Sequence, residues 1–173
     1  YDGHQIIRQA YNLIPNANLE VIPNSYEKFM SFKFGKLKFI DSFQFMNTSL
    51  EKLTENLKQE TGDKYANFNN VKKYYPNHME LLCNKGFYPY EWVDTDEKLD
   101  YNGLPDQNSF FSSITKEMIN EDDYKKALTI YDELGCNSFM DYHLTYLKCD
   151  VLLLSDIFEN FRMTCDDNYG LDP

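Results

Sequence analysis

The chain lacks long hydrophobic segments, has few cysteines and is short of positive charge. No apolar run approaches the roughly 20 residues of a membrane-spanning helix, and no signal-peptide pattern opens the sequence. Its four cysteines form no C-x-x-C pair, which argues against a zinc knuckle or a disulfide framework and fits a reducing compartment. Lys and Arg total 17 against 28 Asp and Glu, a net charge of -11. Because proteins that hold phosphate backbones usually present a basic face, this excess favours cation binding or a place within a larger, partly basic protein.

What the chain does contain is enough apolar material for a folded core. Its 173 residues are 42% hydrophobic and 16% aromatic, which argues for one folded domain rather than a disordered chain. The first residues, Y-D-G-H, include no Met and lead at once into a stretch with apolar periodicity. We therefore interpret the chain as part of a longer protein.

Apolar spacing predicts a mixed α/β chain. Between residues 29 and 40, two arms alternate apolar and polar side chains around Gly35-Lys36, which predicts a hairpin with a type II′ turn. Helices are expected at residues 4–13 (ended by Pro15), from Thr48 with a capping box to Glu51, at 76–85, at 121–134, and from Ser138, capped with Asp141, to about residue 164. Residues 94–113 show no clear period and predict a surface loop or insertion. Two or three strands are few for an α/β domain, so we expect further strands upstream of Tyr1.

The segment Y-H-L-T-Y-L-K-C-D places Tyr146 and Asp150 one helical turn apart. Residues four apart lie on the same helix face, so a phenol and a carboxylate point into one space. The residues that follow, V-L-L-L, are apolar, so Asp150 lies at the edge of a core. An unpaired carboxylate is costly there unless a metal or another partner compensates it. Taken alone, Asp150 and Asp2, at the mouth of the first helix, also have an ordinary explanation as solvated or capping acids.

Several segments, in order, resemble the proofreading exonuclease region of protein-primed family B DNA polymerases, found in linear plasmids, some viruses and large self-synthesising transposons. Y-D-G-H-Q-I-I is similar to the end of the second exonuclease motif, N-x(2–3)-[FY]-D. L-K-F-I-D-S-F-Q-F-M-N-T-S-L-E-K-L and K-G-F-Y-P-Y-E-W resemble blocks typical of the transposon and plasmid members, and D-Y-H-L-T-Y-L-K-C-D resembles the third motif, Y-x(3)-D. Y-G-L-D-P resembles the exit toward the polymerase domain. Each motif is short, but their shared order and spacing are specific.

The resemblance implies an incomplete ribonuclease-H-like fold over residues 1–165, with 166–173 starting the link to the polymerase domain. Asp2 and Asp150 would be two of four carboxylates that hold a pair of Mg²⁺ or Mn²⁺ ions. Tyr146 would orient the attacking water or the scissile phosphate. The D-x-E of the first exonuclease motif, the Asn of the second and the palm motifs of the polymerase are absent from this sequence. We therefore expect the fragment alone to be inactive.

Further residues are implied to contact the primer end. Lys85, with Tyr88 as the apolar member, fits the family's K-x-x-h motif and would place a positive charge near the phosphate, although a solvated lysine at a helix end is an equally good interpretation. Tyr90 would stack on an unpaired base unless it belongs to the core. Ser42-Phe43 matches a primer-contacting Ser/Thr-Leu pair, with Phe in place of Leu; Ser49-Leu50 fits the letters but is typical of a capped helix. Tyr1 would contact the primer end. No further candidate ligand stands at metal-ligand spacing from His4 or His143 in the sequence, so we interpret both as structural or solvent-facing.

The leading hypothesis is therefore an enzyme fragment: the 3′→5′ exonuclease region of a DNA-directed DNA polymerase that starts from a protein hydroxyl. Its expected partners are single-stranded primer and template DNA, a terminal priming protein and the remaining polymerase domains. Two alternatives stay open, namely a binding module without catalysis and an inactive transposon remnant. The nucleus, a virus factory and the mitochondrion all fit as locations.

Overall fold

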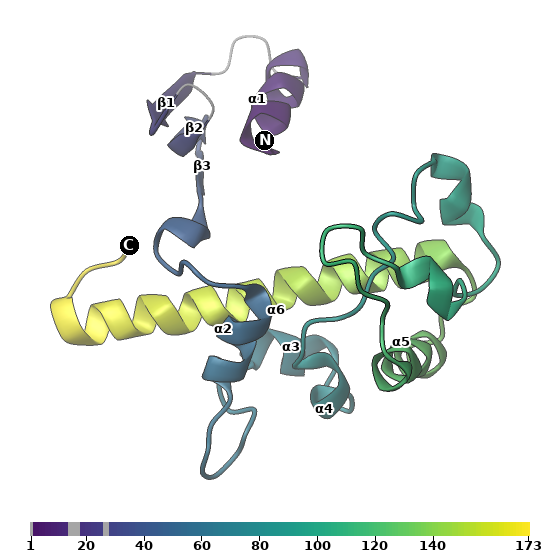
Figure 1. Cartoon of the computed structure of the whole chain (residues 1–173). Helices are drawn as coiled ribbons and strands as arrows, with labels where there is room; N and C mark the ends of the chain where they lie inside the picture. Colours follow the sequence, from purple (N-terminus) through teal and green to yellow (C-terminus); the bar gives the residue numbers. More distant parts are fainter. Residues whose placement is uncertain (1, 14–17, 26–27) are drawn as a thin grey trace. The chain divides into compact units, whose positions relative to one another are not determined.

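The computed structural model describes residues 2–13, 18–25 and 28–173 and divides the chain into two units, Tyr1–Thr48 and Ser49–Pro173 (Figure 1). The described residues form helices and one small sheet of three antiparallel strands. The ribonuclease-H-like arrangement and the strands expected upstream stay predictions. None of the helices in the described ranges combines the length and apolar character that crossing a bilayer requires.

The first unit consists of helix α1 and a three-stranded meander. Helix α1 spans Asp2–Leu13, and the strands are β1 (Leu19–Pro23), β2 (Phe29–Phe34) and β3 (Leu37–Ile40), in the order β1-β2-β3. The predicted helix and hairpin are confirmed, whereas β1 is an additional strand that the apolar pattern does not predict. The hairpin aligns Phe34 with Leu37, and Gly35 has φ +60°. Because Lys36 keeps a negative φ, these angles agree with the type II′ turn.

The second unit is built around the long helix α6, Phe139–Tyr169 (Figure 1). The elements that precede it are α2 (Leu50–Leu57), α3 (Asn69–Tyr74), α4 (Met79–Leu82), η2 (Asp96–Asp100), η3 (Gln107–Phe110) and α5 (Glu121–Glu133). Helices α2 and α3 and the 3-10 turn η2 contact α6. Helix α6 therefore lies at the centre of this unit and contributes much of its core.

The core face of α6 follows from the three- and four-residue spacing of its apolar side chains. The buried residues on it are Phe139, Tyr142, Cys149, Leu152, Leu153 and Ile157. Asp156 is buried among them at 2% exposure. Its carboxylate accepts the backbone N–H groups of Asn70 at 2.7 Å and Val71 at 3.0 Å, so it ties the start of α3 to α6. Because both acceptor oxygens are paired, this buried charge is compensated.

Two helix ends agree with the prediction and two others do not. Ser138 and Asp141 form the expected capping box of α6, and Gly135 with φ +68° follows α5 as predicted. Helix α6, however, continues past residue 164 to Tyr169, because Gly170 (φ +64°) is the residue that ends it. The N-cap of α2 is Ser49, not Thr48, since the Ser49 hydroxyl accepts the Lys52 N–H.

The middle of the chain departs most from the prediction. The helix expected at residues 76–85 shrinks to the single turn of α4, and α3 lies in a stretch whose sequence is mostly polar. The predicted loop 94–113 is irregular as expected, but two 3-10 turns organise it and Phe110 is buried at 7% exposure. Buried Pro105 also belongs to this segment. Part of it therefore belongs to the core and is not a solvated loop throughout.

Candidate functional site

The candidate site lies where the segment K-G-F-Y-P-Y (residues 85–90) passes the turn of α6 that carries Tyr146 and Asp150. The hydroxyl oxygens of Tyr90 and Tyr146 are 2.7 Å apart, and either can donate the hydrogen bond. The Tyr88 ring packs on the Tyr146 ring with centroids 4.9 Å apart. Two segments more than fifty residues apart in the sequence therefore meet at one phenol.

Gly86 makes the close approach of these two segments possible. A Cβ atom at residue 86 would lie 3.1 Å from Cδ2 of Tyr146, closer than ordinary van der Waals contact. The Tyr146 ring therefore lies close to the backbone at Gly86 and also packs on the ring of Tyr88. Local spacing indicates only a helix stop for this glycine, because its contact depends on a distant residue.

Tyr88 is itself fixed by His143, three residues before Tyr146 on α6. The Tyr88 hydroxyl and Nδ1 of His143 are 2.7 Å apart. The Tyr88 ring also packs near Phe139, with centroids 5.7 Å apart. His143 is thus part of the packing around Tyr88, in line with its interpretation as structural.

Asp150 is half-buried, and its Oδ1 atom has no hydrogen-bond partner among the described residues. Burial raises the pKa of this carboxyl group above its usual value, while the Tyr146 side chain and the positive charge of Lys85 partly oppose the rise. An ionised carboxylate with a buried, unpaired oxygen is costly. A bound cation is one group that would compensate it.

Tyr146 stays protonated at neutral pH. Burial raises its pKa most, and the hydrogen bond with Tyr90 and the charge of Asp150 raise it further. A phenol that keeps its proton can donate a hydrogen bond to a water molecule or to a phosphate oxygen. The site therefore combines an acceptor-only carboxylate with a fixed hydroxyl donor.

A metal would find an incomplete set of ligands in the part of the chain that the structure describes. Within residues 2–13, 18–25 and 28–173, no group of three or more His, Cys, Asp or Glu side chains could hold a metal ion. The orphaned oxygen of Asp150 nevertheless fits a hard cation such as Mg²⁺ or Mn²⁺, which prefers oxygen ligands. Asp150 is thus one candidate ligand of a site that needs others.

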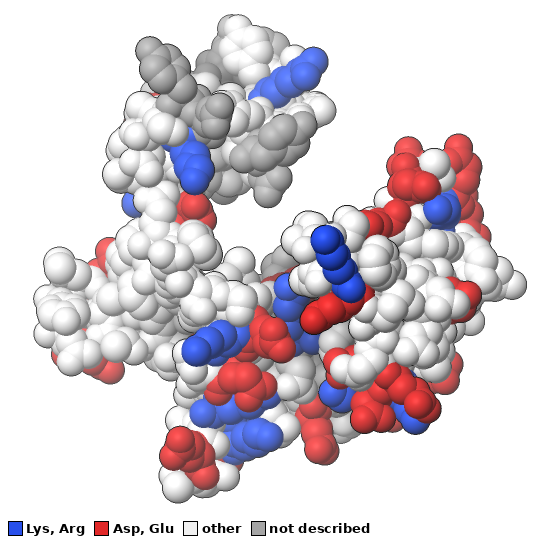
Figure 2. All heavy atoms as spheres, in the orientation of Figure 1, with Lys and Arg blue, Asp and Glu red and all other residues white. Residues whose placement is uncertain are grey.

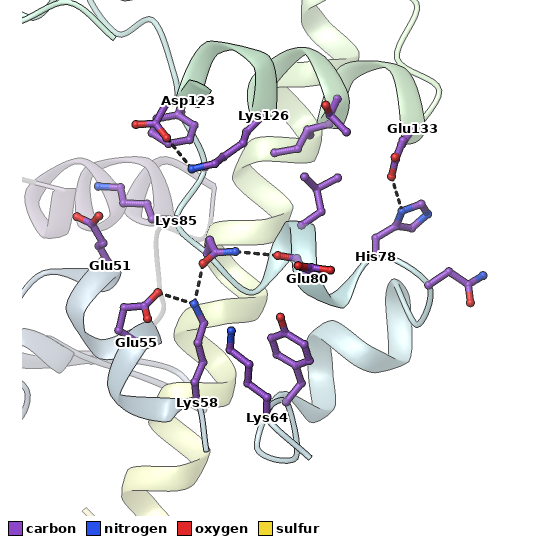
Figure 3. Close-up of a pocket in the computed structure, with 18 residues that line it drawn as sticks. Glu51, Glu55, Lys58, Lys64, His78, Glu80, Lys85, Asp123, Lys126 and Glu133 are labelled. Atoms are coloured by element: carbon purple, nitrogen blue, oxygen red, sulfur yellow. Dashed lines mark hydrogen bonds and ion pairs between the residues drawn. The ribbon is translucent and has the colours of Figure 1, made fainter. Parts of the chain in front are cut away.

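A polar pocket of about 740 Å³ is lined in part by Lys85 and Gly86 (Figure 3). Most charges around it are already paired. Lys58 binds Glu55 and the amide oxygen of Asn84 (2.7 Å). Further ion pairs join Lys126 to Asp123 at 2.7 Å and His78 to Glu133 at 3.2 Å. Acidic and basic side chains are interspersed over the second unit on the face drawn in Figure 2.

The other four predicted residues, Tyr1, Asp2, Ser42 and Phe43, lie in the first unit. Ser42 begins the 3-10 turn η1 (Ser42–Gln44), and the N–H of Phe43 bonds to Asp41 Oδ1 at 3.0 Å. The Phe43 side chain is 56% exposed and borders a pocket of about 560 Å³ between sheet and α1. Tyr1 and the side chain of Asp2 lie outside the described residues. The expected meeting of Asp2 with Asp150 therefore stays a prediction.

In the K-G-F-Y-P-Y block, the fully buried residue is Pro89, and Tyr90 is 64% exposed.

Comparisons of the chain with protein-family models, with curated proteins and with solved structures found no match. The chemistry of the described residues is consequently the basis for a functional assignment.

Proposed function

We propose that this chain is part of the 3′→5′ exonuclease region of a protein-primed family B DNA polymerase, where it helps to remove nucleotides from a single-stranded 3′ end. The observation that carries the proposal is Asp150, whose buried Oδ1 has no hydrogen-bond partner in the described part of the chain. The order of the motifs in the sequence supports it as well. The domain would have the ribonuclease-H-like fold that the resemblance implies.

In this proposal each residue of the site has a distinct task. Asp150 would offer Oδ1 as an oxygen ligand, together with Asp2 and carboxylates for which this sequence has no counterpart. Two Mg²⁺ or Mn²⁺ ions, when bound, would stabilise the attacking and leaving oxygens of an in-line displacement. Tyr146 would donate its O–H to the attacking water or to a phosphate oxygen, since its raised pKa keeps the proton in place. Lys85 would offset negative charge at the phosphate.

The direct experiment follows Mg²⁺-dependent loss of 3′ nucleotides from a labelled single-stranded oligonucleotide. It compares the 173-residue chain with a longer chain that carries a D-x-E motif upstream of Tyr1. We expect activity from the longer chain and a loss of about a hundredfold to a thousandfold on Asp150→Ala. Asp167→Ala is the matched control, since it removes an exposed carboxylate from the same helix and should leave the rate unchanged.

The catalytic proposal fails if the longer chain shows no metal-dependent activity, or if Asp150→Ala and Asp167→Ala retain equal activity. Tyr146→Phe is expected to keep the fold and reduce the rate, because it deletes only the hydroxyl group. Equal rates for Tyr146→Phe and the unaltered chain would remove the tyrosine from the mechanism.

A second candidate function is a binding module for single-stranded DNA or the priming protein, without catalysis. The observation that favours it is the exposure of two aromatic side chains, Tyr90 at 64% and Phe43 at 56%, because exposed rings can stack on unpaired bases. Oligonucleotide binding that persists in chelator and in Asp150→Ala, combined with no nuclease activity, would favour this module. Binding that requires Mg²⁺ would favour the nuclease.

A further inference from the structure

The ring of Tyr90 is exposed, but its hydroxyl group is hydrogen-bonded to another side chain. Its side chain is 64% exposed, yet its hydroxyl oxygen lies 2.7 Å from that of Tyr146. The two rings meet edge to face, with centroids 6.3 Å apart and planes at 86°. A residue whose only task was to stack on a base would need its ring and not its hydroxyl. The geometry therefore gives the Tyr90 O–H a task of its own.

The same short segment also fixes the ring of Tyr146. Gly86 approaches the ring so closely that an added Cβ would lie 3.1 Å from Cδ2 of Tyr146, and the Tyr88 ring packs on it with centroids 4.9 Å apart. Tyr88 is held in turn by the 2.7 Å contact of its hydroxyl with His143 Nδ1. Two contacts thus restrict the ring, and the Tyr90 hydroxyl fixes its tip.

Hydroxyl placement matters here because Asp150 lies one helical turn beyond Tyr146 on α6. Catalytic groups must be held close to their productive geometry, and side chains on a helix achieve this best when their rotamers are locked by neighbours. Tyr146 on α6 has such neighbours in Gly86, Tyr88 and Tyr90.

We infer that Tyr90 is a positioning residue, whose hydroxyl holds the Tyr146 hydroxyl in place for hydrogen bonding beside Asp150, with Gly86 and Tyr88 restraining the ring. The inference rests on the proposed nuclease function for its consequence, but its structural part holds for the chain alone. It replaces base stacking as the main role of Tyr90.

The first test is spectroscopic and needs no enzyme activity. Tyrosine rings are labelled for NMR, and the Tyr146 signal is assigned by its disappearance in Tyr146→Phe. Tyr90→Phe should shift this signal, because it removes the hydroxyl group whose oxygen lies 2.7 Å from that of Tyr146. Tyr101→Phe, which alters another partly exposed tyrosine of the same unit, should leave the signal in place. An unchanged Tyr146 signal in Tyr90→Phe would overturn the inference.

The second test separates positioning from base stacking by kinetics in the longer, active chain. Tyr90→Phe keeps the ring and removes the hydroxyl, so positioning predicts that kcat falls about fivefold to tenfold with an unchanged KM for single-stranded DNA. Gly86→Ala should likewise lower kcat, because the methyl group displaces the Tyr146 ring. Stacking predicts instead that Tyr90→Phe is fully active and that Tyr90→Leu raises KM, a result that would overturn the inference.

The two tests also separate this inference from the proposed function. A shifted Tyr146 signal in a protein without nuclease activity would support the positioning contact and contradict the nuclease. A normal nuclease whose kcat is indifferent to Tyr90→Phe would support the proposed function and contradict the role of Tyr90.

Discussion

Helix α6 carries two aspartates, six residues apart, whose surroundings differ: Asp156 is buried at 2% exposure, whereas Asp150 is half-buried. At Asp156, both carboxylate oxygens accept backbone N–H groups at the start of α3. At Asp150, Oδ1 has no partner within the described residues. The two hydrogen bonds of Asp156 explain on structural grounds alone why an acid is present there. The contacts of Asp150 do not explain its presence in this way. A buried charge therefore indicates a functional site only once the hydrogen bonds of its oxygens have been counted.

Removing the compensated carboxylate should have the largest effect on stability. Asp156→Ala leaves the N–H groups of Asn70 and Val71 buried without an acceptor, and we expect a loss of about 3 kcal/mol in the free energy of unfolding. Urea denaturation measures this value. Asp167→Ala is the control and should stay within about 0.5 kcal/mol. If Asp156→Ala lowered the free energy of unfolding by no more than Asp167→Ala does, the hydrogen bonds of Asp156 would not stabilise the fold and this account of Asp156 would be wrong.

Removing the Asp150 carboxylate, whose Oδ1 is unpaired within the described residues, should have a smaller effect that depends on pH. The folded chain raises the pKa of Asp150 because burial disfavours its charge. Folding therefore favours the protonated form relative to the unfolded chain, and this stabilisation is present below the pKa of an unfolded aspartate, about 3.9, and lost as pH rises through the raised pKa. Asp150→Asn should become more stable relative to the unaltered chain between about pH 4 and pH 7.

Urea denaturation of the unaltered chain and of Asp150→Asn, at about pH 4 and at about pH 7, measures this change in relative stability. A difference in unfolding free energy that stays constant across this range, or that changes in the opposite direction, would show that folding does not raise the pKa of the Asp150 carboxyl group.

The smallest expected effect concerns the packing beside Asp150, which the reactivity of the Cys149 and Cys83 thiols reports. Burial raises the pKa of the Cys149 thiol to about 11 and that of Cys83 to about 12. At about pH 8 both should react with iodoacetamide about two hundredfold or more slowly than free cysteine, since only the thiolate reacts. Mass spectrometry of the labelled peptides measures the rates. Labelling as fast as in the urea-unfolded chain would show that this face of α6 is not packed.

Local sequence signals predict the elements that local chemistry determines. The hairpin at Gly35, the capping box at Ser138 and the helical turn from Tyr146 to Asp150 all depend on residues a few positions apart, and each is present as predicted. Helix α3 escapes prediction because its start is stabilised by Asp156, 85 residues away in the sequence from Val71. The shortened α4 likewise shows that an apolar spacing does not by itself sustain a helix.

The residues of the candidate site likewise fall into two groups: those whose local geometry the sequence predicts, and those whose role depends on contacts with distant residues. The i, i+4 spacing predicts that Tyr146 and Asp150 share one face of a helix, and the order of the motifs is what singles them out as candidate site residues. The tasks of Gly86 and His143 cannot be predicted in this way, because each depends on a contact with a residue more than fifty positions away. The hydroxyl of Tyr90 escapes sequence reasoning for the same reason, since its ring alone suggests a stacking role.

The most direct test of the central claim is Mn²⁺ binding followed by paramagnetic line broadening in NMR spectra of this chain, a method sensitive to weak binding. If Asp150 offers an unpaired oxygen to a cation, the signals of the Tyr146 ring and of the Asp150 backbone should broaden first, and Asp150→Asn should abolish the effect while Asp167→Asn leaves it intact. Signals near Asp156 should broaden less, because that carboxylate already accepts two N–H groups. Broadening that is equal in the unaltered chain and in Asp150→Asn would contradict the account.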